Sequence, residues 1–352
     1  MAKASARKKA ASNQVARSSA KKSTRSESRA ERLARVRAEA RQAKVAKRSS
    51  GIRHAVASGS DRRAVRPLVV RSHLSSQSAN SFSGLAPAPG AARASYGQLY
   101  GLHQTPDPLE LKSSVALVMD QDTNEVVFAK NSEAILPIAS LTKLMTALVM
   151  VEAHLPYDEA VTITHDDVDT EKNSSSRLAV GTTLTRGELL HLALMSSENR
   201  MASALARHYP GGRPAFIRAM NNKAKQLGMR NSRFYDSTGL STRNVSTARD
   251  LAKLITAAYR QPLIRQFTQD TNKEMRFSTP AYSLMFNNTN PLVKNPDWDV
   301  RLSKTGYTDE AGRCLLMRAK PDNQELAIVL LNSVGKRTHI GDANRIRKWL
   351  KS

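Results

Sequence analysis

Three short motifs that carry hydroxyl, amine and amide side chains follow one another along the second half of the chain. They are Ser140–Lys143 (SLTK), Ser197–Asn199 (SEN) and Lys304–Gly306 (KTG). The S-x-x-K spacing of the first motif recurs four more times in the chain, so that motif alone is weak evidence. All three motifs in this order are typical of a serine site that transfers acyl groups.

Ser140 and Lys143 could provide a nucleophile and its base. A serine hydroxyl attacks a carbonyl efficiently only when a base removes its proton. On a helix, residues i and i+3 lie on one face with Cβ atoms about 5–6 Å apart, so both side chains point the same way. Lys143 must be neutral to act as a base, and burial or a nearby cation such as Lys304 lowers a lysine pKa. The apolar run after Ser140 (LTKLMTALVMVEA) predicts this burial.

The other motif residues suit proton transfer and substrate binding. Ser197 can relay a proton between a lysine and the leaving amine, because a hydroxyl both donates and accepts. Asn199 can hold Lys143 and a substrate amide. Lys304 and Thr305 can bind a terminal carboxylate or polarise the site.

Two backbone N–H groups are candidates for stabilising the oxyanion of a tetrahedral intermediate. The N–H of Ser140 lies at a predicted helix start, where backbone donors are unpaired. The N–H of Tyr307 follows the third motif on a predicted strand. Gly306 would let that strand approach the substrate closely, because glycine has no side chain.

Each of these residues taken alone has an ordinary structural explanation. Ser140 fits a helix N-cap, Lys143 an exposed helix lysine and Lys304 a solvated strand residue. One acyl-transfer site explains all three motifs together, whereas the ordinary explanations would need a separate coincidence for each motif. The S-x-x-K copies within residues 5–22 also lack a following apolar helix.

Two strands and a central helix are predicted around the first motif. Ser113–Met119 (SSVALVM) and Glu125–Lys130 (EVVFAK) flank a polar turn, which predicts a hairpin. The helix that Ser140 opens is apolar on most of its sides, so we expect it in the middle of the domain.

The second motif falls in a helical region. Thr185 begins a capping box, and the helix that it starts is predicted to reach Ser197. Thr247 is predicted to cap a later helix at Ala248–Tyr259. Residues 152–260 are therefore predicted to form a mostly helical lobe.

The third motif falls where strands return, at 301–305, 313–320 and 325–333, before a terminal helix at 344–351. Strands from both ends of the chain would then form one sheet, from about 113–130 and 300–352. Antiparallel strands with helices on their faces predict an α+β domain.

Residues 1–105 are predicted to be a basic, disordered tail and linker, and residues 106–352 the folded domain. Residues 1–112 hold 23 Lys and Arg against 6 Asp and Glu, a net charge of +17 out of +25. Their few large apolar residues bury too little surface to offset the entropy of ordering. Weak contact with polyanions and a solvated tail without a partner both remain open.

The cysteine count, the spacing of metal-ligating residues and the length of the apolar stretches exclude several other kinds of site. The single cysteine, Cys314, excludes an intramolecular disulfide and is expected to be a buried small residue rather than a reactive thiol. No metal-ligand spacing stands out beyond the weak candidate His165–Asp167, so neither a metal nor a cofactor is expected. No stretch is long enough to span a membrane, and no apolar region of a signal peptide follows the basic N-terminus.

The region from about Pro106 to the C-terminus resembles the low-molecular-mass penicillin-binding proteins, which are serine D-Ala-D-Ala peptidases. Within them it is most similar to the D-alanyl-D-alanine endopeptidase branch. Besides the three motifs, the resemblance rests on PIASLTKLMTA (137–147), SSSRLAVG (174–181), ELLHLALMSSEN (188–199), STGL (237–240), FNNTNPLV (286–293) and LSKTGYTDEAGRC (302–314).

The resemblance implies a β-lactamase/penicillin-binding-protein-like fold, with an antiparallel sheet flanked by helices and a mostly helical lobe. It implies Ser140 as the acyl-enzyme nucleophile, Lys143 as its base, Ser197 and Asn199 as the second catalytic element, and Lys304 as a carboxylate binder. It also implies peptidoglycan peptide stems as substrate, β-lactams as inhibitors and the periplasm as compartment. The basic N-terminal extension departs from the family pattern, in which a signal peptide is expected.

Three other functions remain open. A DD-carboxypeptidase, which removes a terminal D-Ala, is the nearest alternative. A class A β-lactamase needs a deacylating glutamate, and no E-x-x-L-N pattern lies between the second and third motifs. A polyanion-binding protein with an inactive peptidase-like domain is favoured only by the basic tail.

Overall fold

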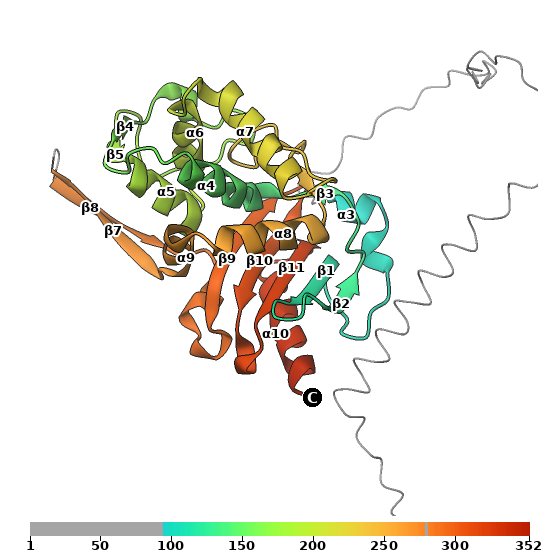
Figure 1. Cartoon of the computed structure of the whole chain (residues 1–352). Coiled ribbons are helices and arrows are strands. Elements are labelled where there is room, and N and C mark those ends of the chain that lie inside the picture. The colour runs from blue at the N-terminus through green and yellow to red at the C-terminus, as the bar shows by residue number, and fades with distance from the viewer. Residues whose placement is uncertain (1–93, 279–280) are drawn as a thin grey trace, which may run out of the picture. The chain divides into compact units, whose positions relative to one another are not determined.

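A five-stranded antiparallel sheet forms the centre of the chain in the computed structural model, which describes residues 94–278 and 281–352 (Figure 1). The strand order is β2-β1-β11-β10-β9, so both ends of the described chain contribute to one sheet. The bounds are β1 Ser113–Asp120, β2 Val126–Lys130, β9 Val300–Thr308, β10 Gly312–Ala319 and β11 Leu326–Ser333. The predicted first hairpin and the predicted α+β sheet are confirmed.

Helices cover both faces of this sheet. The helix α8 (Ala248–Tyr259) packs on β1, β10 and β11, and the terminal helix α10 (Thr338–Lys351) packs on the other side of β10 and β11 (Figure 1). Every residue of β11 is buried, which explains why this strand is a continuous apolar run rather than an alternating one.

The helix α4 (Thr142–Glu152) is the centre of a helical lobe. All its residues except Glu152 are buried, and it contacts α5 (Arg186–Met195), α6 (Asn199–Arg207) and α7 (Gly212–Gln226). The predicted central position of this helix is therefore confirmed. The predicted caps also hold, because Thr185 and Glu188 form a reciprocal capping box and the Thr247 side chain accepts from the Asp250 N–H.

Smaller elements complete the lobe. The strands β4 (Ala160–Thr162) and β5 (Thr183–Thr185) pair with each other, as do β3 (Leu136–Pro137) and β6 (Val245–Ser246). The second pair places the segment before Ser140 beside residues more than 100 positions later.

The helix α9 (Pro262–Gln269) and the hairpin β7–β8 (Asn272–Ser278 and Ala281–Asn287) are among the elements that were not predicted. The hairpin extends away from the rest of the described chain (Figure 1). One face of the hairpin packs on the core, because Met275 and Phe286 are buried and Phe277 and Leu284 are partly buried, while the residues between them are exposed. The alternating pattern is short, since each strand gives only two or three residues to the core, so it is a weak signal in the sequence.

The folded part also begins earlier than the predicted boundary at residues 105/106. Residues assigned to the linker form α3 (Tyr96–Leu99) and η1 (Leu102–Gln104). Gly97 lies so close to Asn332 that an added Cβ would be 2.2 Å from its Oδ1. The predicted disordered tail and its polyanion contact fall almost wholly on residues 1–93, outside the described residues.

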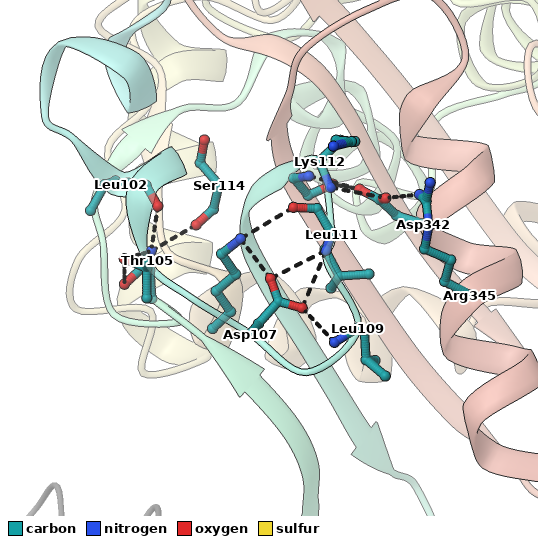
Figure 2. A network of polar contacts seen from close by, with 12 residues as sticks. Leu102, Thr105, Asp107, Leu109, Leu111, Lys112, Ser114, Asp342 and Arg345 are labelled. Atoms are coloured by element: carbon teal, nitrogen blue, oxygen red, sulfur yellow. Dashed lines mark hydrogen bonds and ion pairs between the residues drawn. The ribbon is translucent and has the colours of Figure 1, made fainter. Parts of the chain in front are cut away.

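Polar contacts hold this N-terminal segment on the sheet (Figure 2). The Asn131 amide donates to the carbonyls of Leu102 and Ser114, and Asp107 accepts from Lys130 Nζ at 2.8 Å. Asp342 of α10 accepts from the backbone N–H groups of residues 112 and 113. Because these anchors are polar side chains rather than an apolar pattern, hydrophobic periodicity did not find the segment.

We expect Lys130→Met to destabilise the protein by about 3–5 kcal/mol, because it leaves the Asp107 carboxylate buried without its partner. The two side chains are only 3% and 5% exposed. The free energy of unfolding from urea titration measures the effect. Arg276→Met is the matched control, because Arg276 pairs with Glu274 while remaining 80% exposed, and its free energy of unfolding should change far less than that of Lys130→Met. Equal costs for both variants would contradict the account.

Candidate active site

The structure brings the three motifs together from four elements. Ser140 lies in η2 (Ala139–Leu141), a 3₁₀ turn that leads into α4, and Lys143 lies in the first turn of α4. The second motif joins α5 to α6, and the third lies on β9. Among the five strands, β9 is an edge strand, so one of its sides faces η2 instead of another strand.

The Lys143 amine contacts three other groups of the site. Its Nζ lies 2.8 Å from Ser140 Oγ, 2.6 Å from Asn199 Oδ1 and 2.8 Å from the carbonyl oxygen of Thr238. The amide and carbonyl oxygens only accept, so a neutral amine would use its two N–H groups on them. Its lone pair would then face the Ser140 hydroxyl, which is the geometry of a general base.

Burial lowers the pKa of Lys143 from 10.5 to about 7, while the negative charges of Asp236, Glu198 and Asp169 partly oppose this shift. The sequence analysis invoked burial together with the charge of Lys304, and burial is the main cause. The pKa of Lys304 is also lowered well below its ordinary value, first by burial and then by the charge of Lys143. A serine beside an amine with a pKa near 7 can be deprotonated at neutral pH.

Lys304 reaches the second motif. Its Nζ lies 2.8 Å from Ser197 Oγ and 2.9 Å from the carbonyl oxygen of Thr305. The hydroxyl of Ser197 therefore stands beside one of the two buried amines, and Asn199 beside the other. This arrangement could move a proton between the lysines and a leaving group.

Ser197 is not on a helix, which corrects the sequence analysis. The helix α5 ends at Met195, and Ser197 has a φ of +64° in the turn before α6. Ala139, directly before Ser140, has a φ of +46°. Non-glycine residues in this left-handed region cost on the order of 1–3 kcal/mol, and the strain lies beside both serines of the site.

Two glycines allow the backbone segments of the site to meet. A Cβ on Gly306 would lie 3.0 Å from the backbone nitrogen of Ser140 and 3.1 Å from the carbonyl oxygen of Ile138. A Cβ on Gly239, whose φ is +87°, would lie 1.9 Å from the carbonyl oxygen of Ala139. Gly306 was expected to let the strand approach a substrate, and in the structure both Gly306 and Gly239 let the backbone approach η2.

The sequence analysis missed the loop that carries Gly239 as part of the site. The Asp236 carboxylate accepts from the N–H and hydroxyl of Thr238 and from the N–H of Gly239. This fixes the Thr238 carbonyl that accepts from Lys143. An aspartate two residues before the turned backbone is the signature of an Asx turn, so Asp236-Ser237-Thr238-Gly239 was readable as a turn but not as part of the site.

Other contacts extend the predicted substrate-binding residues. Thr305 Oγ1 donates to Thr289 Oγ1 at 2.6 Å, and Ser174 Oγ accepts from the Asn199 amide. The Tyr307 ring is half exposed, and its hydroxyl donates to Asp309. The role of the Tyr307 N–H as an oxyanion donor stays a prediction.

We expect the rate of acylation at Ser140 to rise about tenfold per pH unit below pH 7 and to level off above about pH 8, because only neutral Lys143 accepts the proton. The pKa is lowered, so the neutral amine gains at a pH where an ordinary lysine stays charged. Timed labelling with a fluorescent penicillin between pH 5 and 9.5 measures this profile. A midpoint near 10 would contradict it.

Outside the site, Cys314 is buried as predicted, and burial raises the pKa of its thiol to about 12. No helix within residues 94–278 and 281–352 is long and apolar enough to cross a membrane. In the same residues, no cluster of three or more metal-ligating side chains is present. The weak candidate Asp167 is instead paired with Arg207 and Arg213.

The chain is similar to known proteins in both sequence and structure. The family model Peptidase S11, described as D-alanyl-D-alanine carboxypeptidase, matches residues 102–335. The D-alanyl-D-alanine endopeptidases of Pseudomonas aeruginosa and Escherichia coli are 47% and 46% identical over 243 residues. Both alignments cover 69% of this chain and 78% of the relative. The crystal structure of the Streptomyces K15 DD-transpeptidase is similar with a TM-score of 0.64 and 27% identity, over 70% of this chain and 99% of that one.

Proposed function

The chain belongs to the Peptidase S11 family of serine D-Ala-D-Ala peptidases, and from this premise we propose that it cleaves D-alanyl bonds in peptidoglycan cross-links through an acyl-enzyme on Ser140. The observation that carries the proposal is the position of the buried Lys143 amine, 2.8 Å from Ser140 Oγ. A buried lysine with a lowered pKa beside a serine has the chemistry of a base and its nucleophile.

In the proposed acylation, Ser140 Oγ bonds to the D-alanyl carbonyl carbon while its proton passes to Lys143 Nζ. The backbone N–H groups of Ser140 and Tyr307 stabilise the oxyanion. The carbon–nitrogen bond then breaks, and the leaving amine receives a proton through Ser197 and its neighbour Lys304. Water then attacks the resulting ester and gives one proton to the pair Ser197 and Lys304, while Lys143 returns its proton to Ser140 Oγ and the acid product leaves.

Endopeptidase activity is proposed over carboxypeptidase activity because the two relatives named above are endopeptidases. The test is digestion of a purified cross-linked peptide dimer beside a free pentapeptide. Faster cleavage of the dimer supports the proposal. Release of D-alanine from the pentapeptide with an intact dimer would make the protein a carboxypeptidase.

A β-lactamase remains the alternative of a different reaction type, because it would use the same three motifs. The absence of an E-x-x-L-N pattern between the second and third motifs argues for slow deacylation of a penicilloyl enzyme. Rapid turnover of a chromogenic cephalosporin would favour the β-lactamase. An inactive polyanion-binding protein would neither label with penicillin nor cleave either peptide.

The proposed compartment is the periplasm, because a peptidoglycan substrate lies outside the cytoplasmic membrane. Penicillin labelling of intact cells followed by fractionation tests this placement. Labelled protein in the periplasmic fraction supports it, and protein found only in the cytosol excludes it.

Since α3 and η1 belong to the folded part, residues 1–93 of the predicted tail 1–105 are proposed as a separate part that is dispensable for catalysis. Their charge supports weak contact with polyanions, which salt should abolish. Retention of a fragment of residues 1–93 on heparin at low salt tests the contact, and elution at the void would exclude it. The heparin test leaves the peptidase proposal untouched.

A further inference from the structure

The cavity that contains Ser140 continues well past the motif residues. It has a volume of about 500 Å³, and beyond Thr305 and Gly306 it is lined by Arg313, Lys336 and Arg337. A cavity of several hundred Å³ is large enough for a peptide segment and exceeds what a single D-alanine needs. The sequence analysis assigned no role to these three cations.

These cations have no acidic partner among the described residues. Arg313 stacks on the Tyr307 ring at 4.1 Å, and within residues 94–278 and 281–352 no hydrogen bond or ion pair engages the side chains of Lys336 or Arg337. No residue that lines the cavity is acidic. Three positive charges around one cavity without a counter-charge attract anionic ligands.

The neighbouring carboxylates are already engaged. Asp309 accepts from the Tyr307 hydroxyl, Glu310 pairs with Lys172, and Asp342 accepts from Ser113 and pairs with Arg345. None of these acidic side chains is in contact with the three cations. Asp309 and Glu310 stand near Tyr307 and offset part of this charge, but neither of them lines the cavity, whose charged lining residues are all positive.

A buried histidine also lines this cavity. His339 lines it, is only 7% exposed, and its Nδ1 has no hydrogen-bond partner within residues 94–278 and 281–352. Burial lowers the pKa of His339 to about 4, and the charge of Arg313 contributes, so the ring is neutral. A buried polar atom without a partner costs free energy unless a ligand satisfies it.

We propose that Arg313, Lys336, Arg337 and His339 form a subsite that binds free carboxylates on the second peptide stem of a cross-link, the stem that leaves when the D-alanyl bond is cut. The subsite adds to the carboxylate-binding role assigned to Lys304 and Thr305. The inference rests on the proposed endopeptidase function, because only a cross-link places a whole acidic peptide beyond the scissile bond. It gives the enzyme a physical reason to prefer cross-links to terminal D-alanine.

The test compares two substrates. One is a cross-linked peptide dimer, and the other is the same dimer with the free carboxylates of the leaving stem amidated, except the carboxylate beside the scissile bond, which is left for Lys304 and Thr305. We expect the intact protein to cleave the acidic dimer with at least about tenfold higher kcat/KM, since charge-assisted hydrogen bonds would be lost on amidation. The triple variant R313Q/K336Q/R337Q should lose this preference, mainly through KM. The matched control K225Q/R230Q/K348Q removes three exposed cations elsewhere and should keep it.

Penicillin labelling distinguishes failure of the proposed function from failure of the proposed subsite. If the intact protein neither labels nor cleaves the acidic dimer, the proposed function fails. If it labels and cleaves both dimers equally well, or if R313Q/K336Q/R337Q keeps the tenfold preference, the subsite is excluded. Thermal melting shows whether the triple variant is folded, and the single variant K336Q, at an exposed position, should weaken the preference severalfold if the triple variant fails to fold.

Discussion

Lys143→Met should lower the rate of penicillin acylation by at least ~10²–10⁴-fold, because it removes the base and keeps most of the side-chain volume. The amine contacts Ser140, Asn199 and the Thr238 carbonyl, so no other described group stands in its place. Lys304, the other buried amine of the site, contacts Ser197 instead. Timed labelling with a fluorescent penicillin measures the loss.

Lys143→Arg is the informative companion variant. A guanidinium stays charged at every accessible pH, so it restores a cation without restoring a base. We expect this variant to be as inactive as Lys143→Met. If the arginine variant were acylated within tenfold of the rate of the intact protein, the positive charge and not the proton acceptor would be the essential property. Circular dichroism spectra identify any variant that fails to fold.

Gly239→Ala should have the second-largest effect, because the new Cβ would lie 1.9 Å from the carbonyl oxygen of Ala139. The clash is between two backbone segments, so no flexible side chain can move aside. We expect a loss of about 3 kcal/mol or more in the free energy of unfolding, from the left-handed backbone and the overpacking together. We also expect acylation to fall at least ~10²-fold, because displacement of η2 misplaces Ser140.

Gly228→Ala tests the effect of the left-handed backbone conformation without the clash. Gly228 also has a left-handed φ, +67°, but a Cβ there meets nothing within 4 Å. This variant should cost only about 1–2 kcal/mol and should label normally. If both glycine variants behave alike in stability and labelling, contact between Gly239 and Ala139 does not position the nucleophile.

Much of the fold was predictable because its pattern is apolar. The strands β1, β10 and β11 and the helix α4 are buried along nearly their whole length, and their runs of apolar residues mark them in the sequence. The capping box at Thr185 was predictable because the contact is local. Each of these signals depends on neighbours along the chain.

The parts of the fold and the site that were not predicted depend on contacts with residues far away in the sequence. The segment from Ser95 to Thr105 is held by hydrogen bonds to Asn131 and Asn332. These contacts leave no periodic pattern of apolar residues in the sequence, so the segment could not be predicted as folded. The positive φ of Ser197 ends a helix that the local pattern would continue. The Asp236 turn reads as an ordinary loop until the Thr238 carbonyl is seen 2.8 Å from Lys143 Nζ. The motif residues were readable, whereas the groups that position them were not.

Mass spectrometry of the penicillin adduct tests the central claim most directly. The account places the acyl-enzyme on Ser140, activated by Lys143. After brief treatment with penicillin and proteolysis, one covalent adduct should map to Ser140, and Ser140→Ala should carry none. An adduct on Ser197 or another residue, or an adduct that persists in Ser140→Ala, would contradict the account.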